Sequence, residues 1–390
     1  MKSRDLLVIA HSYYPWDPRI RKQVTAALDA GLTVDVVCLR DAGEPARSEQ
    51  GALRVRRLAI RRDRGRGVAG YAFEYLSFGV LAFFVASALF VRHRHRVVQA
   101  HNIPDELVFA ALLPRLAGAH VVLDIHDFMP ELFATRYGLA DEHAVVRLLR
   151  MMEQWSCALA QTVIVTHERG RRRLLERGVA PEKLVVVMNT APMPDAPPVR
   201  TRSDRFRVLY HGILSDVYDL ETAVRAIGLL RDQGVTDVEL WLVGDGPRRN
   251  RLRTLIDELG LGAQVRLDGA IAAEQVPALI EQADAGFAVL ADGEHQQIAL
   301  PTKMFEVVAH GLPVVTSRTL VIGDHFDESA ALFVKAGDAP ALAGAMRRLR
   351  DDAGYARSLA EGAWRATWPI RWQEMARRYV ELVARRGAER

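Results

Sequence analysis

Cysteine is scarce in this 390-residue sequence: only Cys38 and Cys157 are present, each in an apolar segment and far from the other. This scarcity excludes a small fold held together by disulfides, and it predicts two buried free thiols in a reducing compartment. A long N-terminal hydrophobic run is also missing, because the apolar segment 6–10 is too short for a signal peptide. We therefore expect a cytoplasmic protein whose first apolar segment is a buried β-strand.

Several motifs that define other functional classes are absent as well. The turn after the first strand has no G-x-G-x-x-G sequence, which argues against a dinucleotide-binding protein. The sequence has no motif for nucleic-acid recognition, no Asp-x-Asp pair and no His/Cys cluster with metal-ligand spacing. We therefore predict no metal ion, no cofactor and no nucleic-acid partner.

Composition and charge indicate a globular protein with a mild excess of positive charge. Hydrophobic residues make up 49% of the chain and charged residues 26%, which is typical of globular proteins. The length favours two domains over one. A net charge of +4 and a sequence pI of about 9.2 suit an anionic substrate or an anionic membrane surface.

Short apolar strands alternate with helical segments along the whole chain. Strands are predicted at 6–10, 33–39, 55–60, 97–100, 121–125, 162–166 and 184–188 in the first half, and at 207–210, 238–243, 265–267, 285–290 and 314–316 in the second. Residues 191–198 between the halves contain four prolines, a composition typical of a linker. The pattern predicts an α/β protein with two Rossmann-like domains.

A long apolar run from Tyr75 to Val91 follows a cluster of arginines between Arg54 and Arg66. The run is about as long as the shortest membrane spans, but Glu74 and two serines interrupt its margins. Two interpretations stay open: a helix that packs on the sheet and dips into an anionic bilayer surface, or a fully buried core helix. The neighbouring arginines favour the first, because basic residues beside an apolar face suit anionic lipid.

The segment 300–317 has the features of a ligand-binding helix followed by a strand. Pro301 suits a helix start, and Gly311 suits the left-handed position after a helix. Lys303 and Glu306 lie three residues apart, so both can occupy one face near the helix N-terminus. A helix N-terminus with a lysine beside it attracts a phosphate, and a carboxylate accepts hydrogen bonds from ribose hydroxyls. The alternative is an ordinary capped helix with a surface ion pair.

Two strand ends that contain histidine predict a second functional region. His101 follows the strand 97–100, and His126 and Asp127 follow the strand 121–125. Ligands of open α/β sheets bind just outside the carboxyl ends of the strands, so both ends should face one cleft. For His101 the alternative, a hydrogen-bonded histidine beneath a loop, is favoured.

These segments and several others form an ordered set of motifs. The set comprises Asp17-Pro18-Arg19, Asp124-Ile125-His126-Asp127 with Pro130-Glu131, Tyr210-His211-Gly212, Gly244-Asp245-Gly246-Pro247, Leu300-Pro301-x-Lys303-x-Phe305-Glu306, Gly311-Leu312-Pro313-Val314-Val315, and a terminal helix with Trp368 and Trp372. Across essentially the whole chain, the set resembles family-four retaining glycosyltransferases of the bacterial cell-surface polysaccharide branch. The resemblance implies the GT-B fold: two Rossmann-like domains facing a central cleft, at 1–192 for the acceptor and 193–370 for the nucleotide sugar. It also implies a C-terminal helix, 371–390, that crosses back to the first domain.

The resemblance assigns the donor nucleotide to residues of the second half. It implies that Glu306 binds the ribose hydroxyls and that Lys303, next to Pro301, lies near the pyrophosphate. Gly212 would let the backbone pass close to the phosphates, where a side chain would block the approach. Gly244 would lie in a turn near the nucleotide, with a plain αβ turn as the alternative.

The transferred sugar and the acceptor fall, by the same resemblance, to the first half. His126 would hydrogen-bond the transferred sugar, and Asp127 would orient the sugar or the acceptor. Asp17 and Arg19 would lie at the mouth of the cleft, with His101 as a weaker candidate. For Arg19 a surface position at the helix start remains the alternative.

The function implied is that of a retaining, metal-independent hexosyltransferase at the cytoplasmic membrane face. It would move a sugar from a UDP- or GDP-linked donor to a lipid-linked or growing glycan acceptor in cell-surface polysaccharide synthesis. Two positions depart from the family pattern: Ile298 replaces a glutamate, and the segment 214–219 around Val217 has no arginine or lysine for the pyrophosphate. Two alternatives therefore stay open, a catalytically silent GT-B partner subunit or another GT-B nucleotide-sugar enzyme, such as an epimerase or phosphorylase.

Overall fold

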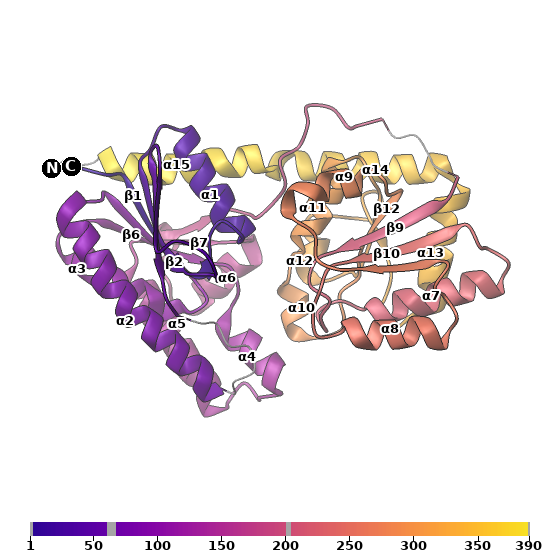
Figure 1. Ribbon diagram of the computed structural model, residues 1–390, viewed down its shortest axis with the longest axis horizontal. Helices are drawn as coiled ribbons and strands as arrows, with labels where there is room; N and C mark the ends of the chain where they lie inside the picture. Colours follow the sequence, from indigo (N-terminus) through magenta and orange to yellow (C-terminus); the bar gives the residue numbers. More distant parts are fainter. Residues whose placement is uncertain (1–2, 61–67, 200–203, 389–390) are drawn as a thin grey trace. The chain divides into compact units, whose positions relative to one another are not determined.

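The computed structural model describes residues 3–60, 68–199 and 204–388, and the chain forms two compact units (Figure 1). The first unit comprises residues 1–189 and 374–390, and the second comprises residues 190–373. From the sequence, residues 190–192 were expected in the first domain and residues 371–373 in the C-terminal helix that joins it. In the structure both stretches belong to the second unit. The later arginines of the predicted cluster, which lie within 61–67, fall outside the described residues.

The first unit is built on an eight-stranded sheet in the order β3-β4-β2-β1-β5-β6-β7-β8. The strands are β1 (Leu6–Tyr13), β2 (Val34–Leu39), β3 (Arg47–Gln50), β4 (Leu53–Leu58), β5 (Val97–His101), β6 (His120–Ile125), β7 (Thr162–Val165) and β8 (Leu184–Val186). Neighbouring strands run parallel, except that β3 runs antiparallel to β4. Central strands such as β2 and β5 are buried along their whole length, as expected for apolar strands with helices on both faces.

Helices cover both faces of this sheet. They are α1 (Pro18–Asp29), α2 (Val68–His93), η1 (Asp105–Ala111), α3 (Leu112–Leu116), α4 (Met129–Tyr137), α5 (Ala144–Leu159), α6 (Glu168–Glu176), η2 (Pro181–Lys183) and α15 (Trp372–Ala388). Figure 1 shows α1 and α15 on one face and α2 on the other. Between β5 and β6 the chain forms the short pair η1 and α3 in place of one continuous helix. Both cysteines are free and buried, as predicted.

Helix α15 packs on the first unit through residues spaced one turn apart. Met375, Tyr379 and Val383 are each at most 3% exposed. This i, i+4, i+8 spacing places all three side chains on one helix face. The C-terminal helix therefore contributes a buried stripe to the core of the first unit.

The second unit contains a six-stranded parallel sheet in the order β11-β10-β9-β12-β13-β14. The strands are β9 (Phe206–His211), β10 (Val238–Val243), β11 (Val265–Asp268), β12 (Ala285–Ala288), β13 (Val314–Thr316) and β14 (Leu332–Phe333). The helices are α7 (Leu220–Asp232), α8 (Arg249–Glu258), η3 (Ala273–Gln275), α9 (Val276–Ile280), α10 (Glu294–Ile298), α11 (Thr302–Ala309), α12 (Leu320–Gly323), α13 (Ala339–Asp351), α14 (Ala353–Thr367) and η4 (Trp368–Ile370). Helices α13 and α14 were not predicted from the sequence.

Strand register brings the predicted site residues to common sheet edges. In the first unit Ala10 is the register partner of His101, and His101 is the partner of Asp124, so β1, β5 and β6 end side by side. In the second unit Val243 is the partner of His211, so the loops after β9 and β10 are adjacent. The prediction that the histidine-containing strand ends meet is thus confirmed.

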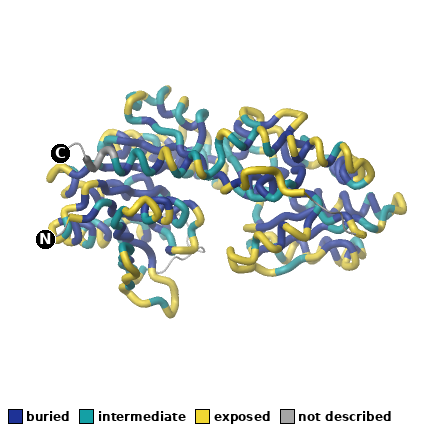
Figure 2. Tube along the Cα trace, turned by 90° about the horizontal axis from the view of Figure 1, so that it is seen from above, coloured by how far each residue is buried: buried dark blue, intermediate teal, exposed yellow. Residues whose placement is uncertain are grey.

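Helix α2 is buried on one side only. Its inward face includes Phe78, Ala82 and Ala86, each fully buried, whereas Phe73 and Phe84 are 67% and 64% exposed. The most apolar 18-residue window of this helix has a mean hydropathy of 1.9, and by length and composition alone the helix, residues 70–93, could cross a membrane. Figure 2 shows that buried positions run through the interior of each unit, whereas exposed positions lie along its outer loops and helices. The interpretation of this run as a fully buried core helix is therefore wrong.

Candidate functional site

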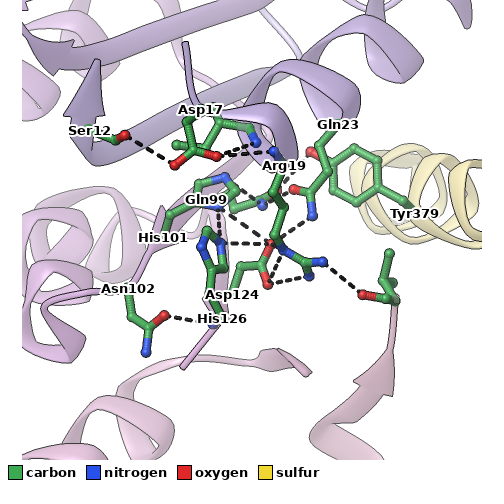
Figure 3. Close-up of polar contacts among 12 residues, drawn as sticks. Ser12, Asp17, Arg19, Gln23, Gln99, His101, Asn102, Asp124, His126 and Tyr379 are labelled. Carbon is green, nitrogen blue, oxygen red and sulfur yellow. Dashed lines mark hydrogen bonds and ion pairs between the residues drawn. The ribbon is translucent and has the colours of Figure 1, made fainter. Parts of the chain in front are cut away.

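A polar hollow of about 160 Å³ opens at the carboxyl ends of β1, β5 and β6 in the first unit (Figure 3). Four residues predicted from the sequence line it: Asp17, His101, His126 and Asp127. The remaining lining residues are Ala10, His11, Ser12, Ile20, Asn102 and Ile103. Such a hollow, walled mostly by hydrogen-bonding groups, suits a hydroxylated ligand such as a sugar.

Asp17 forms one wall of the hollow and is also the N-cap of α1. Its carboxylate accepts hydrogen bonds from the backbone N–H groups of Arg19 (3.1 Å) and Ile20 (3.2 Å) and from the Ser12 hydroxyl (3.1 Å). Burial on its own would raise the pKa of Asp17, but His126 and the helix N–H groups outweigh burial and lower it. The cap therefore holds a negative charge in a fixed orientation at the hollow.

Arg19 lies neither in the cleft nor on the surface, in contrast to both interpretations from the sequence. It is 3% exposed, and its Nη2 and Nε lie 2.6 Å and 3.0 Å from the two carboxylate oxygens of Asp124. Its Nη1 donates to the carbonyl of Val187 at 3.0 Å. Burial alone would raise the pKa of Asp124, but Arg19 and the nearby histidines hold that pKa well below its usual range. A carboxylate inside a buried strand needs such a partner, so Arg19 is an internal counter-ion.

His101 and His126 form a hydrogen-bonded pair at the floor of the hollow. The distance from His101 Nδ1 to His126 Nε2 is 2.9 Å. Burial lowers the pKa of His101 to about 3, so this ring is neutral at pH 7. His126 keeps 18% of its side chain exposed and lines the hollow. His126 is therefore the ring that meets a ligand, and His101 supports it from below.

The same cluster has the spacing of a metal site, which the sequence analysis did not find. One ligand atom each from His101, Asp124 and His126 lie within 4.8 Å of one another. Tetrahedral zinc with bonds of about 2.0–2.1 Å would separate two histidine nitrogens by roughly 3.3 Å. Here the two nitrogens are 2.9 Å apart and share a hydrogen bond, while Asp124 accepts from Arg19 and Gln23. The donor set therefore fits a hydrogen-bonded cluster better than a metal centre.

Asn102 fixes the loop that carries His126. Its Oδ1 accepts from the backbone N–H of His126 at 2.6 Å, and its Nδ2 donates to the carbonyl of Asp127 at 2.6 Å and to Asp105 at 2.8 Å. The side chain of Asp127 is exposed beside the hollow. The Asn102 amide thus holds the backbone of both predicted residues that follow β6, His126 and Asp127. The Asp127 carboxylate stays free to meet a ligand in the hollow.

In the second unit, Lys303 lies at the N-terminus of α11, with Pro301 as the N-cap. The side chain is 8% exposed, and its Nζ is 3.7 Å from the centroid of the Tyr210 ring and 3.6 Å from that of Tyr218. Burial lowers the pKa of Lys303 well below its usual value, and Glu306 opposes that shift. The two ring faces also favour the ammonium form. A buried amine at a helix N-terminus is suited to an anionic group.

Two glycines shape the backbone next to this lysine. Gly212 has φ +124°, and a Cβ there would lie 3.2 Å from Lys303 Nζ. Gly244 has φ +153°, and a Cβ there would lie 1.8 Å from the Gly212 carbonyl oxygen. Gly244 therefore packs against the Gly212 loop, and Gly212 leaves space directly beside the amine.

Glu306 lies one turn after Lys303 and faces solvent more fully. Its side chain is 36% exposed, and Oε2 is 3.5 Å from Nε2 of His211. Burial, and then Lys303, lowers the pKa of His211 to about 3, so this ring is neutral at pH 7. The Glu306 carboxylate is therefore accessible to ligand hydroxyl groups, while the backbone of Glu306 is fixed within α11.

The segment 214–219 supplies structure and an aromatic ring where the family pattern has a cation. Asp216 is ion-paired with Arg248, and the carbonyl of Val217 accepts from the Ala291 N–H at 3.0 Å. Tyr218 contributes one of the two rings on Lys303. Ile298, the other departure, is a half-buried residue at the end of α10. Arg248, the nearby cation, is held by two acidic neighbours, Asp216 and Glu221.

Four polar residues behind the hollow had no role in the site predicted from the sequence: Gln23, Gln99, Tyr379 and Asp124, the last of which was named only as part of a motif. They are each at most 1% exposed and are joined by hydrogen bonds (Figure 3). A signal existed for two of them, because Gln99 and Asp124 interrupt otherwise apolar buried strands. A buried polar side chain in such a strand requires a partner.

Two domain families match the chain in the expected order. The model described as Glycosyl transferase 4-like domain matches residues 17–190, and the model described as Glycosyl transferases group 1 matches residues 205–352. These ranges correspond closely to the two compact units, with the first match beginning at the Asp17 cap.

Curated relatives point to the same class. The lipopolysaccharide core biosynthesis glycosyltransferase LpsD of Rhizobium meliloti is 34% identical over 215 residues, which are 53% of this chain and 58% of that protein. The putative colanic acid biosynthesis glycosyltransferase WcaL of Escherichia coli is 29% identical over 177 residues, 44% of this chain and 43% of that protein. The chain thus spans about half the length of the curated relatives it matches.

Solved structures share the fold over nearly the full length. A sucrose-phosphate synthase from Thermosynechococcus elongatus matches with a TM-score of 0.73 and 20% identity, covering 98% of this chain and 99% of that one. Anabaena HepE in complex with UDP-glucose matches with a TM-score of 0.70 and 15% identity, covering 97% and 99%. At these identities the likeness establishes the GT-B fold alone. The two matched domain families, over residues 17–190 and 205–352, show that the chain belongs to the family-four type of glycosyltransferases.

Proposed function

We propose that the protein is a retaining, metal-independent glycosyltransferase that uses a UDP- or GDP-linked sugar. The observation that carries this proposal is the placement of Lys303, which is buried at the start of α11 beside Gly212 and one turn before the accessible Glu306. A nucleoside diphosphate offers the matching groups, namely phosphate oxygens for the amine and ribose hydroxyls for the carboxylate. Anabaena HepE, a structural neighbour, was solved with UDP-glucose.

The proposed chemistry depends on electrostatics at the leaving group. When the bond between sugar and diphosphate breaks, negative charge builds on the diphosphate. The Lys303 ammonium and the N–H groups of α11 stabilise that charge, a role that a metal ion fills in other enzymes. Retention follows if the acceptor oxygen attacks from the face that the diphosphate leaves.

The sugar and the acceptor are assigned to the hollow of the first unit. His126 would hydrogen-bond the transferred sugar, and the exposed Asp127 carboxylate would orient the sugar or the acceptor hydroxyl. The names of the relatives place them in lipopolysaccharide core and colanic acid biosynthesis. By that analogy we propose a lipid-linked or growing glycan acceptor and a role in cell-surface polysaccharide synthesis.

Calorimetric titration with UDP and GDP tests the proposed donor site. Glu306→Ala should weaken binding of the preferred nucleotide about tenfold or more, because two ribose hydroxyls lose an ionised acceptor. Glu258→Ala, which removes an exposed carboxylate from α8 in the same unit, is the matched control and should bind as the wild type does. Equal binding by Glu306→Ala and the wild type would show that the site assignment is wrong, and no binding of any nucleoside diphosphate would favour a catalytically silent GT-B subunit.

We further propose that α2 rests on the cytoplasmic face of an anionic membrane. Its outer face exposes large apolar side chains that continue onto the neighbouring α3: Phe73, Leu76, Val80, Phe84, Leu112 and Leu116. Exposed arginines lie in the last turn of α2 and just after it: Arg92, Arg94 and Arg96. Apolar area flanked by arginines is the combination that binds anionic bilayer surfaces. Such a position would bring a lipid-linked acceptor close to the hollow at the carboxyl end of β1.

Co-sedimentation with vesicles tests this membrane assignment. The protein should pellet with phosphatidylglycerol-containing vesicles, and the variant Phe73→Ser/Phe84→Ser should remain in the supernatant while binding UDP normally. Leu148→Ser on α5, which removes an exposed apolar side chain outside α2 and α3, serves as the control. Equal pelleting of all three proteins would reject the assignment of α2.

A further inference from the structure

A chain of hydrogen bonds behind the hollow has only one self-consistent direction. It begins at Asp124, whose ionised carboxylate accepts hydrogen bonds and donates none. Nε2 of Gln23 donates to Oδ2 of Asp124 at 2.7 Å, so the amide nitrogen of Gln23 faces the carboxylate. The carbonyl oxygen of Gln23 therefore faces the other way and accepts from Nε2 of Gln99 at 2.6 Å.

Tyr379 of α15 fixes the orientation of Gln99 from the opposite side. The Tyr379 hydroxyl donates to Oε1 of Gln99 at 2.8 Å, and burial raises the pKa of this tyrosine, which keeps the hydroxyl protonated. The amide group of Gln99 is thus held at both ends, with its nitrogen directed to Gln23 and His101. Nε2 of Gln99 also lies 3.0 Å from Nε2 of His101, so the second N–H of the amide faces that ring nitrogen.

This arrangement selects one tautomer of His101. Because an amide N–H faces Nε2, that nitrogen must act as the acceptor. The ring is neutral at pH 7, so its single proton lies on Nδ1 and is donated to Nε2 of His126 at 2.9 Å. Nε2 of His126 is therefore an acceptor, and the proton of a neutral His126 lies on Nδ1. Among the described residues, Nδ1 of His126 has no hydrogen-bond partner.

We propose that Tyr379 and Gln99 are positioning residues that fix His126 as a hydrogen-bond donor to the ligand through Nδ1–H. The group that His126 meets must then be an acceptor, such as a hydroxyl or ring oxygen of a sugar. The C-terminal helix thereby acts on the hollow through the polar chain without lining it. The tautomer assignment stands on the hydrogen-bond geometry together with the neutral state of His101, whereas its effect on turnover rests on the function proposed above.

Nitrogen NMR of the full-length protein, labelled at its histidines, tests the tautomers directly. Protonated and unprotonated ring nitrogens have well-separated shifts, and His101→Gln and His126→Gln identify the signals of interest. In the wild type we expect a protonated Nδ1 and a bare Nε2 on both rings. A proton on Nε2 of His101 would overturn the proposal, and the measurement requires neither activity nor any variant beyond those used for assignment.

Kinetics of two conservative variants test the consequence for turnover. Tyr379→Phe removes one hydroxyl, and Gln99→Met removes the amide at similar volume, so both release the tautomer of His101. We expect kcat to fall about tenfold in Gln99→Met and less in Tyr379→Phe, because His126 then presents the required tautomer to the ligand only part of the time. KM for the donor should stay within about twofold of the wild type. The NMR spectra of both variants should show a mixture of tautomers.

Thr162→Val separates positioning from general loss of stability. Thr162 also has a buried hydroxyl that is hydrogen-bonded to a histidine, His120, at 2.9 Å. It lies at the amino end of β7, whereas the hollow lies at the carboxyl ends of the strands. Its removal should lower stability comparably and leave kcat and the tautomers unchanged. An unchanged kcat in Gln99→Met despite mixed tautomers would reject the positioning role. Full activity of His126→Gln would instead reject the function assigned to His126 and leave the tautomer assignment standing.

Discussion

The buried amine of Lys303 predicts that nucleotide binding is coupled to proton uptake. In the ligand-free protein the amine is 8% exposed and lies between two tyrosine rings, where burial lowers its pKa well below the usual value. A diphosphate placed beside it favours the charged form and raises the pKa again. At a pH above the pKa of the free protein, binding must therefore take up as much as one proton.

The size of this linkage follows from Coulomb's law. One phosphate charge about 4 Å from the ammonium contributes about 4 kcal/mol at an effective dielectric of about 20, which corresponds to a pKa rise of about 3 units. Below the pKa of the free protein both states carry the proton, so affinity is independent of pH. Between the two pKa values affinity should fall by up to tenfold for each unit of rising pH, because the proton must be supplied on binding.

Calorimetry of UDP or GDP binding in buffers of different ionisation enthalpy measures the proton directly. The wild type should show a buffer-dependent enthalpy, and Lys303→Met, which keeps the apolar stem, should show none and bind more weakly. Arg347→Met, which removes one exposed positive charge on α13 of the same unit, is the control and should retain both affinity and proton uptake. A buffer-independent enthalpy between pH 6.5 and 9.5, with equal affinities for wild type and Lys303→Met, would refute the reasoning.

Two further predictions concern the scaffold of the site. Gly244→Ala should destabilise the protein by more than about 2 kcal/mol in urea unfolding and abolish nucleotide binding, because the new Cβ would overlap the Gly212 carbonyl. The control is Gly344→Ala, in the interior of α13, where no atom lies within 4 Å of the new Cβ. It should instead stabilise the protein by about 0.5–1 kcal/mol. Asp124→Asn should cost about 3–5 kcal/mol at pH 7, because it leaves the buried Arg19 without its counter-ion. Since folding depresses the pKa of Asp124, this difference should be complete above the ordinary carboxyl pKa of about 3.9 and shrink as the pH falls further; a difference that grows with acid would contradict the assignment.

The alternation of strands and helices was predictable because it depends on local apolar patterns. Strands such as β2 (Val34–Leu39) and β10 (Val238–Val243) appear where the sequence places them. The helix start at Pro301 and the left-handed Gly311, with φ +74°, were also predicted, since each follows from the backbone chemistry of one residue. Helices α13 and α14 were missed although both begin at a capping aspartate, Asp338 and Asp352.

The placement of Arg19 could not be predicted from its own segment. A charged residue in the first turn of a helix is normally exposed, and only the fold brings Asp124 of β6, more than a hundred residues away, against its guanidinium. The same applies to the tyrosine rings that contact the Lys303 amine. Tyr218 lies in the segment 214–219, for which the sequence indicated only that an arginine or lysine is missing. The local sequence determines which charged and aromatic groups are available. The strand register determines which of these groups lie close enough to interact.

Tyr379 shows how far this dependence on register extends. It lies on the inward face of the C-terminal helix α15, and its ring is fully buried in the core of the first unit. Its hydroxyl, however, has a partner only because β5 carries Gln99 at a position whose neighbours on both sides are apolar. A phenylalanine would fill the same space without the cost of burying a polar group, so packing alone does not account for a tyrosine here. The hydroxyl has a physical reason once the amide of Gln99, and through it the tautomer of His101, must be held in one orientation.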